Sequence, residues 1–167
     1  MIRGFARALA PTGCAILLLL QPTGPSMAAS GGKDVDYLST IRGPIEAGVV
    51  KVRDGDTVEV EAFVWPMQSV RVAVRLRGID APELHGKCAS EKEAAMVARE
   101  RLVSLIGEGR IRLSNIAGDK YFGRVLADVS TDETADVGRE LLKERLVVRY
   151  DGGHKPDWCT ATGSVKP

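Results

Sequence analysis

Apolar and polar positions alternate between residues 47 and 78 in the pattern of three β-strands. "AGVVKV" (47–52) leads to the turn "RDGD", "TVEVEAF" (57–63) follows, and "VRVAVRLRG" (70–78) comes after the connection "WPMQS". Successive side chains of a strand point to opposite faces, so these runs predict half-buried strands joined by tight turns. The positions expected to face a core are Val58, Val60, Ala62, Val72, Val74 and Leu76.

The period of the pattern changes after Pro82. Ser90, with Glu93 three residues later, fits a capping box that opens the helical run "EKEAAMVARERLVSLI" (91–106). Gly107 and Gly109 predict the end of this helix. Its apolar stripe at helical spacing is expected to be core and consists of Ala94, Val97, Ala98, Leu102, Leu105 and Ile106.

The second half of the chain adds two strands, "RIRLSNI" (110–116) and "GRVLADVS" (123–130), a shorter helix at about 136–144, and an extended piece, "RLVVRY" (145–150). Three strands, a helix, two strands and a helix is the element order of a small barrel. We therefore predict an α+β, mainly β fold: a five-stranded OB-fold barrel with a long helix after the third strand and a shorter C-terminal helix.

The N-terminus has the composition of a targeting segment. Arg3 and Arg7 precede the apolar run "CAILLLL", and a polar stretch ends in the small-x-small pattern of Ser26 to Ala28. This pattern predicts a signal peptide at 1–28 and a periplasmic or secreted protein without stable membrane association once processed. An uncleaved anchor is the alternative, although the apolar run is shorter than the roughly 20 residues of a spanning helix.

Length and charge set the expectations for the rest of the chain. The 167 residues fit one domain, here 45–150, preceded by a flexible lead-in at 29–44 and followed by a tail at 151–167. Removing the signal peptide leaves 21 Lys+Arg against 22 Asp+Glu, a formal charge of −1 in place of +1. This balance excludes binding of nucleic acid by overall basicity, so any phosphate binding depends on locally placed arginines. We expect a monomer.

Two cysteines remain after the signal peptide. In an exported protein, Cys88 and Cys159 favour a disulfide that ties the tail to the domain, and the alternative is two unrelated buried thiols. The chain-entropy relation assigns such a loop of some seventy residues a stabilisation of roughly 4 kcal/mol. No CxxC pair is present to indicate zinc.

Charged side chains near the predicted strand ends form a candidate site. Asp56 follows the Asp-Gly turn and Asp80 ends a later strand; two carboxylates with backbone carbonyls suit Ca²⁺ or Mg²⁺. A pair of arginines such as Arg75 and Arg124 can hold a phosphate and stabilise the charge of five-coordinate phosphorus. Glu83, after the rigid Pro82, can activate a water molecule. Each residue alone is also compatible with a solvated surface.

Three motifs carry a resemblance to a known family. "VRDGDTVEV", "VRLRGIDAPE" and "KYFGRVLADV", in this order around a long helix, resemble the staphylococcal nuclease (thermonuclease) family, over about residues 47–150. The resemblance implies an exported bacterial member with an OB-fold and Ca²⁺-dependent cleavage of DNA and/or RNA. By motif, the resemblance implies that Asp56, Asp80 and the Ala81 backbone carbonyl are calcium ligands. It implies that Arg75 and Arg124 are the two catalytic arginines and that Glu83 is the general base.

The segment "DKYFGR" departs from the family pattern. It has one residue more between Asp119 and Gly123 than the usual Asp-Lys-Tyr-Gly-Arg. Either Tyr121 or Phe122 therefore takes the aromatic position that faces the nucleotide, and Lys120 is displaced relative to the phosphate it would meet. Tyr150 is a candidate for a second nucleotide-facing tyrosine.

Two other functional classes remain open. One is an inactive barrel that binds nucleic acid or a protein; the joint presence of the acidic residues and the arginines argues against it. The other is a structural or carbohydrate-binding OB module, which favours an aromatic-rich face, whereas only 5% of this chain is aromatic. We expect Trp65 and Trp158 to be packing residues.

Overall fold

The strand pairings close a barrel. The sheet order is β1-β6-β2-β3-β4-β7, and an additional pairing of β6 with β7 joins five of the strands into a ring. β4 and β7 run parallel, whereas the other pairs in this sheet are antiparallel. The strands are β1 (Thr40–Ile41), β2 (Ile45–Val52), β3 (Thr57–Trp65), β4 (Gln68–Leu76), β5 (Ile79–Asp80), β6 (Arg110–Gly118), β7 (Arg124–Ser130) and β8 (Val148–Arg149).

This computed structural model describes residues 39–107 and 109–160. The predicted signal peptide lies outside these residues, as do most of the lead-in and the end of the tail. Within the lead-in, β1 pairs with the end of β6. Among the described residues, no helix combines the length and apolar character needed to span a bilayer.

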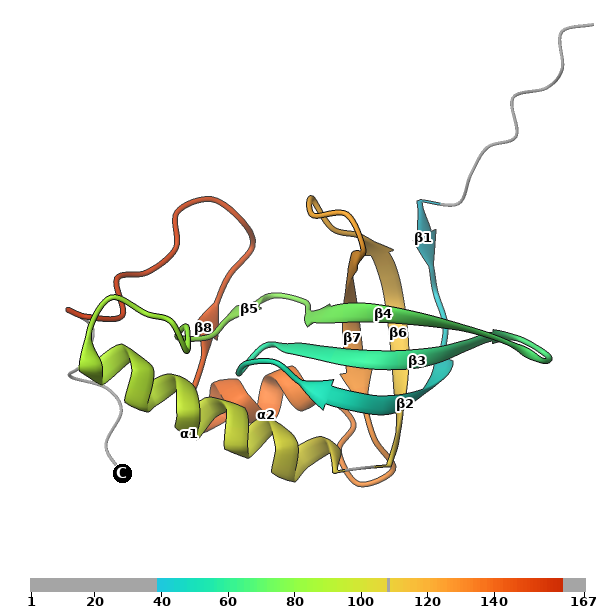
Figure 1. Cartoon of the computed structure of the whole chain (residues 1–167), viewed down its shortest axis with the longest axis horizontal. Helices are drawn as coiled ribbons and strands as arrows, with labels where there is room; N and C mark the ends of the chain where they lie inside the picture. Colours follow the sequence, from blue (N-terminus) through green and yellow to red (C-terminus); the bar gives the residue numbers. More distant parts are fainter. Residues whose placement is uncertain (1–38, 108, 161–167) are drawn as a thin grey trace, which may run out of the picture. The chain divides into compact units, whose positions relative to one another are not determined.

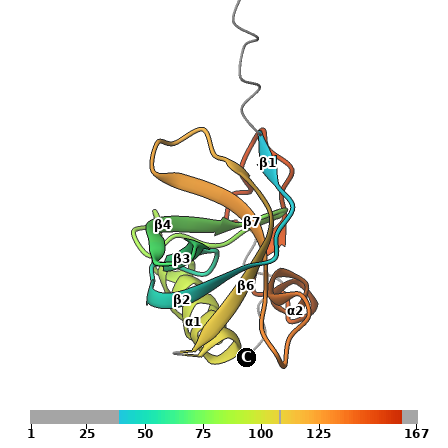
Figure 2. The same cartoon turned by 90° about the vertical axis from the view of Figure 1, so that its right-hand side faces the viewer.

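Two helices accompany the barrel, α1 (Ala89–Ile106) and α2 (Val137–Lys143). Figures 1 and 2 show α1 running past the ends of β2 and β3, with α2 beside it. The predicted fold class, a five-stranded OB-fold barrel with a long helix after its third strand and a shorter C-terminal helix, is confirmed.

The barrel core follows the predicted alternation. Val58, Val60 and Val74 are fully buried, as expected for one face of a pleated sheet. On α1 the buried apolar face is formed by Ala95, Ala98, Leu102 and Ile106. These side chains pack at about four-residue spacing over the barrel end, which fixes α1 against the strands that carry the site.

Two details of α1 differ from the prediction. Its N-cap is Cys88, which makes no side-chain capping hydrogen bond, so the capping box from Ser90 is wrong. The Ser90 hydroxyl instead lies 3.2 Å from Cys88 Sγ. Val97, expected in the core, is 48% exposed, whereas Ala95 is fully buried. Adjacent small residues leave the rotation of a helix poorly determined by its apolar pattern, and packing on the barrel selects Ala95.

The tip of the β3–β4 hairpin contradicts the prediction that Trp65 packs inside. Trp65 is 70% exposed, and its neighbours Phe63 and Met67 are also exposed. Figure 1 shows this hairpin extending away from the rest of the barrel. The alternation that buries the middle of both strands has no facing layer at the tip.

Candidate active site

Strand register brings together acidic residues from separate turns. Thr57 pairs with Arg75 across β3 and β4, so Asp56 lies beside Arg75, and the Leu76 amide donates to the Asp56 carbonyl at 2.8 Å. The turn before Asp56 approaches α1 closely: a Cβ at Gly55 would lie 2.7 Å from the Ala98 Cβ. Glycine at this position therefore allows the turn to reach the site.

Arg75 joins the two predicted metal-ligand carboxylates. Its Nη1 donates to Asp56 Oδ1 at 2.8 Å, and its Nη2 donates to Asp80 Oδ1 at 2.9 Å. Unlike the exposed Arg71 and Arg77 of the same alternation, Arg75 is only 9% exposed, and Asp80 is fully buried. We call these three residues the site floor. A buried guanidinium between two carboxylates satisfies charges that would otherwise be costly to bury.

Asp56 is held by several further donors. The Ala81 amide donates to its Oδ2 at 3.0 Å and the Thr57 hydroxyl to its Oδ1 at 2.8 Å. Burial raises the pKa of Asp56 to about 7, against the opposing effect of Arg75, and the nearby Asp54 raises it further. For Arg75, burial is outweighed by Asp56 and Asp80, so its pKa is raised. Burial is therefore the main reason that the pKa of Asp56 is raised.

A cleft of about 710 Å³ lies next to the floor. The predicted site residues that line it are Arg75, Glu83, Lys120, Tyr121, Arg124 and Tyr150. Asp56, Asp80 and Ala81 are buried and lie beneath the lining. Phe122 is fully exposed and is not part of the lining, so Tyr121 is the aromatic residue of the "DKYFGR" segment that faces the cleft.

The turn between β6 and β7 forms one wall of the cleft. The Arg124 guanidinium pairs with Asp119 and lies 4.5 Å from the centre of the Tyr121 ring. Lys120 Nζ lies 5.1 Å from the same ring. We call residues 119–124 the site rim. Its cations stay partly exposed, with 23% of the Arg124 side chain accessible, and they can contact an anionic ligand.

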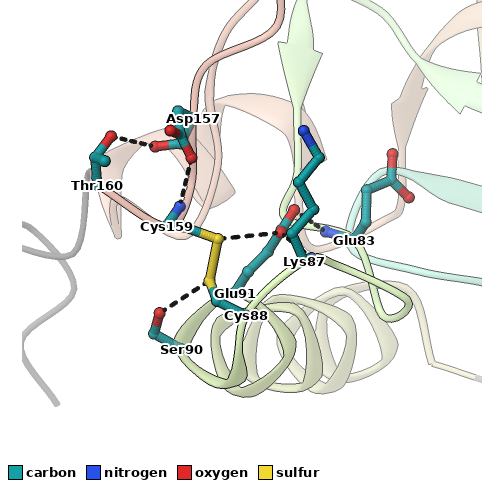
Figure 3. The surroundings of a disulfide bond; sticks show 8 residues. All are labelled: Glu83, Lys87, Cys88, Ser90, Glu91, Asp157, Cys159 and Thr160. Carbon is teal, nitrogen blue, oxygen red and sulfur yellow. Dashed lines mark hydrogen bonds between the residues drawn. A yellow bond between two sulfur atoms is a disulfide. The ribbon is translucent and has the colours of Figure 1, made fainter.

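Glu91 of α1 holds the loop that carries Glu83 through hydrogen bonds to backbone amides of that loop. The Glu91 carboxylate accepts hydrogen bonds from the Lys87 amide at 2.8 Å and the Glu83 amide at 3.4 Å (Figure 3). A Cβ at Gly86 would lie 2.3 Å from Glu91 Cδ, so a larger residue there would have to displace the Glu91 carboxylate. Glu91 is 8% exposed. This buried carboxylate therefore determines where the Glu83 backbone lies.

The predicted disulfide between Cys88 and Cys159 is present, with the two Cα atoms 6.0 Å apart. It attaches the C-terminal tail to the start of α1 (Figure 3). The attached tail brings Lys155 to Glu83 and Trp158 to Asp80. Sequence reasoning assigned no role to Lys155 and only a packing role to Trp158, because neither belongs to the motifs near the strands.

Asp54, Asp119 and Glu91 were also missed as parts of the site. Asp54 and Asp119 line the cleft, and both sit next to predicted residues in the motifs "RDGD" and "DKYFGR". Their position beside the motif residues was the available signal. Glu91 could have been noticed as an acidic residue four positions before Ala95 on the buried helix face.

OB-folds commonly bind oligonucleotides or oligosaccharides, and two arginines that line one cleft suit a phosphate group. The profile of the family described as "Staphylococcal nuclease homologue" matches residues 73–157, about half of the chain. The chain belongs to this family. Asp56 lies before the matched range.

Two curated relatives share this region. A "Probable endonuclease LCL3" of Phaeosphaeria nodorum is 32% identical over 96 residues, which is 56% of this chain and 32% of the relative. A protein of the same name from Verticillium alfalfae is 33% identical over 90 residues, 52% of this chain and 31% of the relative. The chain therefore spans about a third of the length of these relatives.

Proposed function

We propose that this protein is a nuclease that hydrolyses phosphodiester bonds of DNA and/or RNA and requires Ca²⁺. The observation that carries the proposal is the convergence of Arg75, Glu83 and Arg124 on one cleft, directly above the Asp56–Asp80 pair. Family membership and the name of the fungal relatives support the reaction class. The calcium requirement rests on the chemistry of the floor.

The floor fits a hard divalent cation by its donor chemistry. Asp56 and Asp80 share one guanidinium, so the two carboxylates are close, and the carbonyl of Ala81 follows directly in sequence. Arg75 and Lys155 form ion pairs with three carboxylates, Asp56, Asp80 and Glu83, and Asp54 is near enough to raise the pKa of Asp56. We propose Asp56, Asp80 and the Ala81 carbonyl as the ligands. When bound, Ca²⁺ would supply a Lewis acid that neutralises charge on the phosphate.

The chain's own residues provide the remaining chemistry. Arg124 on the rim and Arg75 on the floor can donate to the non-bridging oxygens of one phosphodiester, and such donors stabilise the extra charge of the transition state. About half of the Glu83 side chain is exposed (51%), so its carboxylate can accept a proton from an attacking water molecule. Lys120, Tyr121 and Tyr150 also line the cleft and can contact the nucleotides.

The deciding experiment measures hydrolysis of heat-denatured DNA and of RNA by the purified protein, with Ca²⁺, with Mg²⁺ and with excess chelator. We expect cleavage with Ca²⁺ only, and a large loss in Glu83→Gln and Arg124→Ala. Glu93→Gln, an exposed acid on α1, and Arg139→Ala, an exposed arginine on α2, are the matched controls. Cleavage that persists in chelator would refute the calcium requirement. Failure to cleave either nucleic acid, with binding retained, would favour an inactive nucleic-acid-binding barrel.

We further propose that the protein is exported to the periplasm or beyond and acts as a monomer. Support comes from the N-terminal pattern "CAILLLL" ahead of a small-x-small site and from the Cys88–Cys159 disulfide, which persists in oxidising compartments. Cell fractionation with N-terminal sequencing of the recovered protein tests the first part. Light scattering in solution tests the second.

A further inference from the structure

The C-terminal tail contributes a cation to the site floor. Lys155 Nζ lies 2.7 Å from Glu83 Oε1 and 3.1 Å from Asp80 Oδ1, and Lys155 also lines the cleft. None of the three motifs that indicate the family contains this residue. Lys155 thus bridges the candidate base and a candidate metal ligand.

Both oxygens of Asp80 are already bound to donors. Oδ1 accepts from Arg75 and Lys155, and Oδ2 accepts from Trp158 Nε1 at 3.3 Å. The residue is fully buried. Two of its three side-chain donors, Lys155 and Trp158, come from the tail, so the tail covers the Asp80 carboxylate. Because Oδ1 already has two donors, a metal ion that binds Asp80 through Oδ1 must replace Arg75 or Lys155.

The tail is anchored on both sides of Lys155. On one side β8 pairs with β5, Asp80 opposite Val148, and the Tyr150 amide donates to the Gly78 carbonyl at 2.9 Å. On the other side the Cys88–Cys159 disulfide attaches the tail to the start of α1 (Figure 3). The tail is therefore held on both sides of Lys155, and these two attachments keep Lys155 close to Asp80.

Among the donors on Asp80, Lys155 is the one suited to leave. Its side chain is 46% exposed, compared with 11% for Arg75, and a lysine stem has several rotatable bonds. Its ammonium carries the same sign as a metal ion and contacts the same carboxylate oxygen as Arg75. Charge and position together make Lys155 a competitor for the metal.

We propose that Lys155 is a resident cation of the metal-free site, which must leave Asp80 Oδ1 before a divalent cation binds to that oxygen. The tail thereby sets the metal affinity of the nuclease. This inference rests on the proposed function, because it takes Asp80 to be a metal ligand. Removing Lys155 should raise Ca²⁺ affinity by about tenfold or more, because it removes a like charge from the carboxylate that would bind the metal.

Calorimetric titration of Ca²⁺ into the full chain tests this. Lys155→Met is expected to bind Ca²⁺ about tenfold more tightly than the unaltered protein. Lys155→Arg, which keeps the cation, is expected to bind as weakly as the unaltered protein. Lys143→Met, at an exposed lysine of α2, is the matched control and is expected to leave the affinity unchanged.

The outcomes separate the inference from the proposed function. Equal or weaker Ca²⁺ binding by Lys155→Met would overturn the inference alone, as would tight binding by Lys155→Arg. If none of the four proteins bound Ca²⁺, the calcium site itself would be refuted and the inference with it. Thermal unfolding of each variant shows whether it is folded, and Lys155→Gln serves as a second substitution if the methionine variant is not.

Discussion

The floor and the rim of the candidate cleft are built in opposite ways. The floor holds Asp56, Arg75 and Asp80 almost without solvent exposure, at the ends of paired strands. The rim holds Arg124 and its neighbours on the turn between β6 and β7, where Tyr121 is 55% exposed. The floor charges bind one another and are almost fully buried, whereas the rim cations remain partly accessible to a ligand.

Because of this difference, the floor residues should affect both the stability and the activity of the protein, whereas the rim residues should affect mainly its activity. A buried charge that loses its partner is costly, so the floor contributes to the fold as well as to the chemistry. A partly exposed charge is solvated in either state, so the rim contributes to ligand binding at little cost to stability. Substitutions in the two regions should therefore give different signatures.

The largest effect is expected for Asp80→Ala. It leaves the guanidinium of Arg75 buried beside one carboxylate, so we expect a loss of unfolding free energy of about 3–5 kcal/mol together with loss of hydrolysis. Urea unfolding and a nuclease assay measure the two quantities. Asp128→Ala, at a 46% exposed acid on β7, is the control. If Asp80→Ala were as stable as the control variant, the floor would not be a structural element.

Removing the disulfide should destabilise the protein by about 4 kcal/mol, because the bond closes a loop across a sequence separation of 71 residues. Cys88→Ser with Cys159→Ser also frees the tail that covers the floor. The free energy of unfolding in urea is the measurement. A loss well under 1 kcal/mol would mean that the tail docks without the bond.

Arg124→Ala should reduce activity more than it reduces stability. Loss of one transition-state donor costs about 3–4 kcal/mol, roughly a hundred- to a thousandfold in kcat. The unfolding free energy should fall by about 1–2 kcal/mol, less than for Asp80→Ala, because the Asp119 side chain, 8% exposed, loses its partner. A large stability loss would contradict the contrast between rim and floor.

Tyr121→Ala should have a smaller effect. The ring lies against the Arg124 guanidinium, and such a contact is worth about 0.5–1 kcal/mol, or about two- to fivefold in activity if it orients the arginine. Phe122→Ala should change kcat/KM less. The reverse order would assign the nucleotide-facing position to Phe122.

The smallest effect concerns a pair away from the cleft. Arg101 of α1 hydrogen-bonds Glu144 just after α2 and lowers the pKa of Glu144 below its ordinary value of 4.5. The ionised pair stabilises the protein above that value, and the contribution is lost as the pH falls through the lowered pKa. Glu144→Gln should therefore be slightly less stable at neutral pH and equal to the unaltered protein in acid. A constant difference across pH would exclude the ion pair as the cause.

Most of the fold could be predicted from the sequence, because alternation in β3 and β4 and the glycine after α1 are local signals. The predictions were wrong where two neighbouring residues fit the local pattern equally well, or where the pattern does not show what a residue packs against. Ala94 and Ala95 are adjacent, so the sequence could not say which faces the core. Trp65 looked like core because hydrophobicity alone does not report whether a facing layer exists.

The candidate site was predictable to the extent that its residues lie in motifs. Arg75, Asp80 and Glu83 share one stretch, and Asp56 and Arg124 follow recognisable turns. Lys155 and Trp158 could not be found, since their partners Glu83 and Asp80 lie more than seventy residues away in sequence. Nothing near them in sequence indicates a site.

The sequence by itself determined the strands, the long helix, the family and the five charged residues of the motifs, because each depends on residue types within a short segment. Only the tertiary structure decided that Arg75 is buried between two carboxylates, that Tyr121 faces the cleft and Phe122 does not, and that the tail covers Asp80. Burial and charge pairing depend on which strands are neighbours, and strand register and the disulfide set that arrangement across the whole barrel.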